Sequence, residues 1–467
     1  MNLLRACDDP NLFGPWFRDR DTWAAWRAFL AALFALPMTE DELATYRACT
    51  GRTEPPAAPF TEAWLVCGRR AGKSFVLALC AVYLACFRDW RPHLAPGERA
   101  TVLVIASDRR QARVIFRYAL GLLTNVALLR SLVSSQTAGV IELSNGVSIE
   151  VGTASFRSTR GYTLVAALCD ELAYWRTDDS AANPDTEILD ALRPGMATVP
   201  GALLLCASSP YARRGALWEA HQRWHGRDGA PALVWQASTR TMNPTVPQSV
   251  VDEALERDPA SAAAEWLGTF RSDVESYIGR EAVLACVEAG LRERPSVPGC
   301  SYFSFTDPSG GSSDSMTCAV CHRDGGLIIL DAVREIQAPF DPESATTEFV
   351  AFLRSYGIRR TTGDRYASQW VQQAFQKRGI SYEASELSKS ALYQNLLPVL
   401  NGRTVRLLDH PRLVEQICGL ERRTARGGRD TIDHAPGARD DVANAVAGAL
   451  VLASRPSRGV VTRELNR

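Results

Sequence analysis

The stretch Cys67-Gly-Arg-Arg-Ala-Gly-Lys-Ser74 decides the fold of the N-terminal half of this chain. An apolar run at 63–67 precedes it and a longer apolar run at 74–87 follows it, which is typical of a strand and then a buried helix. A glycine-rich turn between a strand and a helix offers backbone N–H groups and a helix N-terminus to anionic oxygens. The stretch therefore predicts a phosphate-binding loop of the P-loop NTPase type.

Each residue of this loop has an expected role at the site of ATP. Lys73 is expected to reach the outer phosphates, and Ser74 to hold a magnesium ion. Cys67 stands where the standard pattern G-x-x-x-x-G-K-[ST] has its first glycine, so the match departs from that pattern at one position. The loop residues expected to bind the nucleotide are Gly68, Arg69, Arg70, Ala71, Gly72, Lys73 and Ser74.

A pair of carboxylates ends a second apolar strand, Val165-Ala-Ala-Leu-Cys-Asp170-Glu171. In a P-loop ATPase the first carboxylate supports Mg²⁺ and the second polarises the attacking water. The alternative, an acidic pair that caps the next helix, does not explain why the pair follows a fully apolar strand. We therefore expect Asp170 in the magnesium site and Glu171 as the catalytic carboxylate.

Two further positions are candidates for the same site. Ser208, in Cys206-Ala-Ser-Ser-Pro210, is placed to sense the γ-phosphate, although a plain Ser-Pro turn explains it equally well. Arg160, in the loop RSTRGYT, is either an arginine finger on a neighbouring subunit's ATP or a surface arginine. Arg69 and Arg70 are the rival candidates for a finger acting within one subunit.

Between residues 64 and 239 apolar strands alternate with helices, with a hairpin at 141–151. Strands that are apolar throughout and separated by helices indicate a parallel sheet covered on both faces. The chain is too long for one ordinary core, so we predict several parts. They are an N-terminal helical segment at 1–60, a P-loop ATPase domain at 61–240, a linker at 241–299 and a second α/β domain at 300–467.

Acidic residues of the last region stand at the ends of the elements expected there. Asp307 follows a β-like run at 302–306, Asp364 closes another strand, and Asp440 and Asp441 open the C-terminal helix. Carboxylates gathered from adjacent strands and a helix bind two Mg²⁺ or Mn²⁺ ions about 3.5–4 Å apart, as phosphodiester cleavage requires. Taken singly, each aspartate also fits a strand end or a helix N-terminus, so the prediction rests on all of them together.

The composition sets limits on the class of protein. The 52 basic and 52 acidic residues balance, which argues against a histone-like partner of nucleic acid but not against local, transient DNA binding. The 12 cysteines are scattered through apolar segments, as buried thiols are. Cys318-Ala-Val-Cys321-His322 matches a haem-attachment pattern, but a strand with its two cysteines on opposite faces is the better explanation.

Neither an export signal nor a membrane span is expected. No apolar run reaches the roughly 18 residues that cross a bilayer, and the N-terminus lacks the apolar core of a signal peptide. The sequence therefore favours a cytoplasmic enzyme.

The order of these motifs resembles the terminase large subunits of tailed phages. The resemblance rests on Gly-Arg-Arg-Ala-Gly-Lys-Ser, then Arg-Gly before Cys-Asp-Glu, then Ala-Ser-Ser-Pro, then the acidic positions, and it covers most of the chain. Phosphate loops of that family often lack the first glycine, as here at Cys67. The segment 104–112 is also similar to the motif after the second strand of helicase-related ATPases.

The resemblance implies an ATPase joined to an RNase H-like nuclease, acting on double-stranded DNA in the host cytoplasm. Family members form a homo-oligomeric ring on the portal protein, receive DNA from a small terminase subunit, translocate it and cut it. It makes Glu171 the catalytic carboxylate, Arg160 the finger in trans and 207–209 the coupling segment. The glutamine by which many related ATPases read adenine has no counterpart before Gln111, so aromatic stacking on Trp23 or Phe17 is the alternative.

Two other functions remain open from the sequence. A helicase-nuclease of DNA repair usually carries a second motor domain, for which the space between residues 239 and 301 is too short. An inactive prophage relic acting as a portal- or DNA-binding scaffold is the non-catalytic alternative. The intact acidic positions and Lys73 argue against such decay.

Overall fold

The computed structural model describes residues 1–153, 161–175, 184–312, 314–364, 369–424, 430–435 and 438–455. The chain divides into two compact units, Met1–Ser272 and Asp273–Arg467. The chain passes from one unit to the other inside the segment 241–299, which the sequence suggests as a linker. The finer domain boundaries drawn from the sequence stay predictions.

The first unit is built on an eight-stranded sheet in the order β3-β4-β5-β2-β6-β7-β1-β8. The six strands from β5 to β8 in this order run parallel, while β4 is antiparallel to β5 and β3 to β4. The strands are β1 Glu62–Cys67, β2 Ala100–Ala106, β3 Val133–Gln136, β4 Val140–Leu143, β5 Val147–Thr153, β6 Thr163–Asp170, β7 Leu203–Ser208 and β8 Leu233–Ala237. The helices are α1 Leu3–Asp8, α2 Arg20–Leu33, α3 Glu40–Thr50, α4 Lys73–Phe87, α5 Arg109–Asn125, α6 Ala127–Arg130, α7 Pro184–Met196, α8 Gly215–Trp224, α9 Thr239–Met242, α10 Gln248–Arg257 and α11 Pro259–Leu267.

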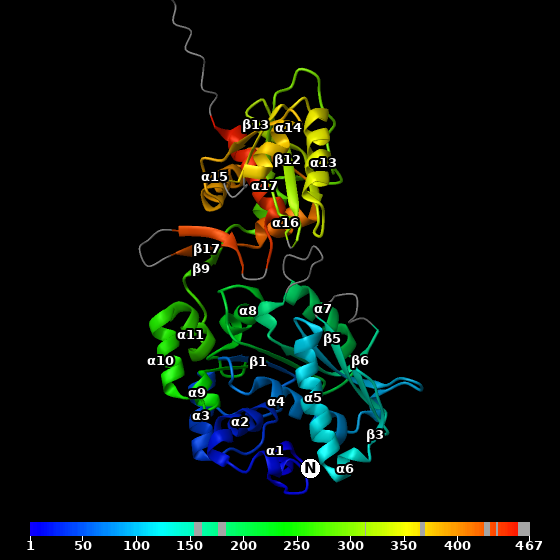
Figure 1. The fold of residues 1–467 in the computed structure, drawn as a ribbon. Coiled ribbons are helices and arrows are strands. Elements are labelled where there is room, and N and C mark those ends of the chain that lie inside the picture. The colour runs from blue at the N-terminus through cyan, green and yellow to red at the C-terminus, as the bar shows by residue number, and fades with distance from the viewer. Residues whose placement is uncertain are drawn as a thin grey trace, which may run out of the picture. The chain divides into compact units, whose positions relative to one another are not determined.

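Both faces of this sheet are covered by helices, as Figure 1 shows. Successive residues of a strand point to opposite faces, so β1 sends Leu65 into the core shared with α2, α4 and α5, and Val66 into the core shared with α7 and α8. The strands are therefore apolar at nearly every position. This burial explains why the sequence reveals them as continuous apolar runs.

The second unit holds a seven-stranded sheet in the order β10-β16-β13-β12-β11-β14-β15. The three strands β11, β12 and β13 form an antiparallel meander, and β14 and β15 continue the sheet parallel to β11. The strands, including a small sheet of β9, β17 and β18, are β9 Val274–Ser276, β10 Val287–Glu288, β11 Tyr302–Asp307, β12 Met316–Asp324, β13 Leu327–Ile336, β14 Arg360–Gly363, β15 Ser381–Ala384, β16 Val405–Leu408, β17 Leu420–Thr424 and β18 Asp430–His434. The helices are α12 Arg280–Leu284, α13 Pro342–Ser355, α14 Gln369–Lys377, α15 Lys389–Asn401, α16 Pro411–Cys418 and α17 Asp441–Ser454.

The C-terminal helix α17 packs unusually closely on β11. A Cβ atom added at Gly448 would lie 2.1 Å from the ring of Phe305, which is fully buried. On the other face of the sheet, α13 and α14 cover a separate core. Cys318 packs into that core and Cys321 into the core beneath α17, so the two cysteines lie on opposite faces as the sequence predicts.

The predicted fold class is confirmed. A parallel sheet with helices on both faces carries the glycine-rich loop, and a second, mixed α/β unit follows it. Among the described residues, no helix combines the length and the apolar composition that a membrane span needs.

Candidate functional site

The predicted phosphate-site residues converge at one edge of the first sheet. The neighbouring strands β6, β7 and β1 run parallel, with Asp170 level with Ala207 and Val66 level with Ser208. The carboxyl ends of three adjacent strands therefore present the loop after β1, the acidic pair after β6 and the serines after β7 to the same place. Ligands of open α/β sheets bind at this edge.

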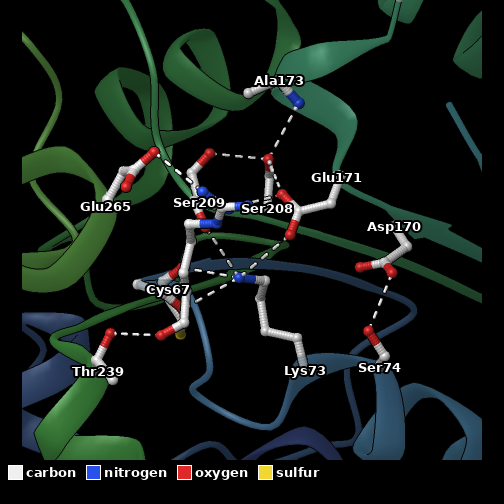
Figure 2. A network of polar contacts seen from close by, with 12 residues as sticks. Cys67, Lys73, Ser74, Asp170, Glu171, Ala173, Ser208, Ser209, Thr239 and Glu265 are labelled. Carbon is white, nitrogen blue, oxygen red and sulfur yellow. Dashed lines mark hydrogen bonds and ion pairs between the residues drawn. The ribbon is translucent and has the colours of Figure 1, made fainter. Parts of the chain in front are cut away.

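Lys73 lies at the centre of this group (Figure 2) and is buried, with 5% of its surface exposed. Its ammonium donates to the carbonyl oxygens of Cys67 at 3.0 Å and Gly68 at 3.1 Å, and to the hydroxyl of Ser209 at 3.1 Å. It also lies 3.6 Å from a carboxylate oxygen of Glu171. Carbonyl and hydroxyl oxygens thus occupy the donors of Lys73 that are expected to serve the phosphates of ATP.

Asp170 and Ser74, the pair predicted to hold magnesium, are in direct contact. The Ser74 hydroxyl donates to Asp170 Oδ2 at 3.1 Å, and Asp170 is buried. Burial, together with the neighbouring Glu171 charge, raises the pKa of Asp170 to about 6. Within the described part of the chain, Asp170 Oδ1 is buried without a hydrogen-bond partner. A carboxylate oxygen left in this state suits a hard cation or one of its water ligands.

Glu171 is held in a constrained conformation beside Lys73. Its backbone is left-handed, with φ of 50°, which costs a non-glycine residue about 1 kcal/mol or more. One carboxylate oxygen accepts from the Ser209 N–H at 3.2 Å and the Ser208 hydroxyl at 3.3 Å. The structure thus places Ser208 against the catalytic candidate. Its expected role in sensing the γ-phosphate stays a prediction.

Residues far along the chain hold the loop itself in shape. Trp26 Nε1 donates to the Ala71 carbonyl at 2.8 Å, the Thr239 hydroxyl to the Arg69 carbonyl at 2.7 Å, and Asn243 Nδ2 to the Arg70 carbonyl at 2.8 Å. These three supports were not predicted, because nothing local marks them.

Gly68 is closely surrounded at the start of the loop. A Cβ atom there would lie 2.2 Å from the Thr239 hydroxyl oxygen, which explains a glycine at this position. The next residue, Arg69, pairs with Glu265 at 3.2 Å instead of pointing freely into the site. Gly72, with φ of 102°, supplies the left-handed turn that enters α4.

Two sequence predictions about the nucleotide remain as they were. Arg160 lies outside the described residues, so its role as a finger is still a prediction. The Trp23 ring packs on Phe17 at 4.7 Å and on Phe75 at 5.5 Å between ring centroids. Phe17 is 5% exposed, which leaves Trp23 as the more accessible of the two rings proposed for adenine.

In the second unit, Asp307 and Asp364 end two adjacent parallel strands. Thr306 of β11 is level with Gly363 of β14, so the next residue of each strand is an aspartate at the same edge. Gly363 is required there, because a Cβ atom would lie 2.0 Å from the Tyr382 hydroxyl oxygen. That hydroxyl donates to the Asp364 carbonyl at 3.3 Å.

Asp441 joins them from the first turn of α17. The Thr317 hydroxyl, on the residue paired with Asp307 across β11 and β12, donates to the Asp441 carbonyl at 2.7 Å. One turn further along the helix, Asn444 Nδ2 donates to Asp307 Oδ2 at 2.9 Å. A helix presents positions three apart on one face, so Asp441 and Asn444 both face the strand ends. Asn444 was not predicted.

The electrostatics agree with this convergence. The pKa of Asp307 is raised to about 8 by burial and by the negative charges of Asp441, Asp364 and Asp440, against the lowering effect of Asn444. Burial and Asp440 raise the pKa of Asp441 as well. A carboxylate whose pKa is raised by neighbouring negative charge is stabilised in its ionised form when a divalent cation binds beside it.

Asp440 faces a different set of partners from Asp441. It accepts from the Tyr393 hydroxyl at 2.8 Å and lies 3.1 Å from the Lys389 ammonium. Its carboxylate also belongs to a small cluster with Asp433 and His434. Lys389 already supplies a positive charge to that cluster, so Asp441 is the better of the two candidates for a ligand shared with Asp307.

The residues at the strand ends of the second unit fit divalent ions. In the described ranges, Asn444 Oδ1 and the Ser315 hydroxyl are buried without a hydrogen-bond partner. The backbone N–H of Ser315 donates to Asp441 Oδ2 at 3.4 Å, which places this hydroxyl beside the carboxylates. Oxygen atoms of this kind match the hard ligands that Mg²⁺ and Mn²⁺ take.

Comparison with known proteins gives structural likenesses of low identity. No family model matches the sequence, and no curated protein matches it. The HK97 bacteriophage large terminase is similar over 92% of this chain and 99% of its own, at 15% identity and a TM-score of 0.40. A large terminase of a thermophilic bacteriophage, solved with ADP, is similar over 85% and 95%, at 12% identity and a TM-score of 0.37. The magnesium-bound terminase nuclease of thermophilic phage G20c is similar over 36% and 93%, at 14% identity and a TM-score of 0.32.

Proposed function

We propose that the chain is the large subunit of a tailed-phage terminase. It drives double-stranded viral DNA into a procapsid by ATP hydrolysis and cuts concatemeric DNA with metal ions. The observation that carries the proposal is the presence in one chain of a phosphate loop facing an Asp-Glu pair and of three aspartates gathered at the strand ends of a second sheet. Either site alone fits many enzymes, whereas packaging and cutting require both.

In the ATPase site the residues would bind the phosphates of ATP, neutralise their charge and orient the attacking water. Lys73 exchanges its carbonyl partners for the outer phosphates, which frees the Cys67 and Gly68 oxygens. Ser74 and Asp170 would hold Mg²⁺, which when bound would supply positive charge to the phosphates. Glu171, fixed through Ser208 and Ser209, orients the water that attacks the γ-phosphate.

In the nuclease site, carboxylates from two strands and a helix would supply the metal ligands. Asp307, Asp364 and Asp441 would hold two Mg²⁺ or Mn²⁺ ions, and ions bound there would supply the Lewis acidity that phosphodiester cleavage needs. Asn444 fixes the Asp307 carboxylate by its 2.9 Å hydrogen bond. The Thr317 hydroxyl ties the start of α17 to β12, and so keeps Asp441 in register with Asp307.

The partners follow from this function. They are double-stranded DNA, the portal protein, the small terminase subunit and further copies of the chain in a ring, all in the host cytoplasm. Arg160 is the finger that such a ring would insert into a neighbour's site.

The test is a pair of assays on the purified chain: DNA-stimulated ATP hydrolysis and Mn²⁺-dependent plasmid cleavage. Glu171→Ala is expected to abolish only hydrolysis, and Asp307→Ala only cleavage. Loss of both activities in either variant would contradict two separate sites. Cleavage without DNA-stimulated hydrolysis in the wild type would exclude a packaging motor, and absence of both would favour an inactive scaffold.

A further inference from the structure

Helix α5 carries an unbalanced positive charge. Its sequence, RRQARVIFRYALGLLTN, contains four arginines and no acidic residue. By contrast, α10 on the same unit mixes Asp252 and Glu253 with Arg257, as solvated helices usually do. The charge is therefore local to α5, because the chain as a whole is neutral.

The arginines whose side chains are described lie on one exposed face. Arg110, Arg113 and Arg117 are exposed, and at 100° per residue they fall within about 60° of one another. Ala112, Ile115, Phe116, Ala119, Leu122 and Leu123 are buried on the opposite side, against α4, β2 and β5. The three guanidinium groups therefore project away from the core along about 10 Å of helix axis.

Other surface arginines of this unit form ion pairs with acidic residues. Arg91 pairs with Asp89 at 2.8 Å and Arg99 with Glu142 at 3.3 Å. Within the described ranges, none of Arg110, Arg113 and Arg117 forms an ion pair.

The clustering of positive charge also destabilises helix α5. Like charges four residues apart, as at Arg113 and Arg117, destabilise a helix by about 0.2–0.5 kcal/mol. A bound polyanion removes this repulsion.

We infer that this face of α5, defined by Arg110, Arg113 and Arg117, binds the phosphate backbone of duplex DNA. The inference rests on the proposed function and adds to it the surface on which the motor holds its substrate. Three cations spread over about 10 Å span roughly three base-pair steps at 3.4 Å each, so they suit successive phosphates of one strand. Contacts of this kind position a duplex without reading its sequence, as a packaging motor requires.

The surface lies close to the ATPase site along the chain. Only Ser107 and Asp108 separate β2 from α5, and Ile105 of β2 is level with Cys169, one residue before Asp170. Asp108 caps α5 by accepting from the N–H groups of Arg110 and Gln111. A mechanical force that bound DNA exerts on α5 would therefore act close to Asp170.

The experiment measures the affinity for a fluorescent duplex oligonucleotide at salt concentrations from about 50 to 200 mM. The variant is Arg110→Ala/Arg113→Ala/Arg117→Ala. The matched control, Arg223→Ala/Arg227→Ala/Arg257→Ala, removes three exposed arginines from other parts of the same unit. A third protein replaces the α5 arginines by lysine, which keeps the charge.

The α5 alanine variant is expected to bind at least about tenfold more weakly, with a log–log salt slope reduced by about 2–3, since each lost phosphate contact removes about 0.9. The control and the lysine variant are expected to keep the wild-type slope. The alanine variant should melt no lower than the wild type, because its like-charge repulsion is gone.

If the wild type binds duplex DNA and the alanine variant binds it equally well, α5 is not the DNA-binding surface. That result would not contradict the proposed packaging function. An equal loss in the control variant would also overturn the α5 surface. Failure of the wild type to bind duplex DNA at all, or a preference for single-stranded RNA as competitor, would overturn both the surface and the proposed function.

Discussion

Substitution of Gly448 by alanine should disable the nuclease site from a position that touches none of its carboxylates. The added Cβ would lie 2.1 Å from the Phe305 ring, whereas carbon atoms pack at about 3.5–4.0 Å. Phe305 is fully buried, so we expect α17 to move away from β11 by more than about 1 Å to relieve the contact. This movement separates Asp441 on the helix from Asp307 on the strand.

The magnitude follows from two opposing terms. Overpacking a core costs about 1–3 kcal/mol, and the better helix propensity of alanine returns about 1 kcal/mol. We expect a net loss of about 0–2 kcal/mol, and each kcal/mol lowers the Tm of a unit of this size by about 2–4 °C. A displacement of about 1 Å costs up to about 100-fold in rate, so Mn²⁺-dependent cleavage should fall by that order while ATP hydrolysis is unchanged.

The matched control is Gly121→Ala in α5, where a Cβ atom meets nothing within 4 Å. It should leave cleavage unchanged and raise stability by up to about 1 kcal/mol. Combining Gly448→Ala with Phe305→Leu makes room for the methyl group and should restore part of the cleavage. Wild-type cleavage and melting in Gly448→Ala alone would refute the close packing of α17 on β11.

Three further outcomes are expected. Thr239→Val leaves the Arg69 carbonyl without its hydrogen bond and should raise the KM for ATP about tenfold or more, measured by steady-state hydrolysis, with cleavage intact. Asn444→Ala should raise the Mn²⁺ concentration needed for half-maximal cleavage by about 10–100-fold without changing ATP hydrolysis. Burial lowers the pKa of the stacked rings of His221 and His225 below 6.5, so their contribution to stability is complete above about pH 6.5 and is lost as the pH falls through the folded values. Thermal unfolding measured at a series of pH values should show this loss. In His221→Gln/His225→Gln the Tm should depend less on pH.

Local chemistry made part of this protein predictable. The loop from Gly68 to Ser74 and the pair Asp170-Glu171 could be predicted because their residue types follow directly on apolar strands in the sequence. The aspartates at 307, 364, 440 and 441 were predicted for the same reason, as charges at the ends of apolar elements.

Other contributors leave no such trace. Thr239, Asn243 and Trp26 reach the loop from 45 to 173 residues away along the chain, by single hydrogen bonds to carbonyl groups that every residue possesses. Asn444 resembles any polar residue in a helix until α17 lies against β11. Their function is visible only once the chain has folded.

The sequence by itself determined the order of strands and helices, the parallel sheet and the identity of the charged side chains, because periodicity and burial act over a few residues. Only the tertiary structure decided that Lys389 and Tyr393, from a helix distant along the chain, hold the Asp440 carboxylate. Neutralising a buried charge depends on which partners lie within a few ångströms, and that distance is a property of the folded chain alone.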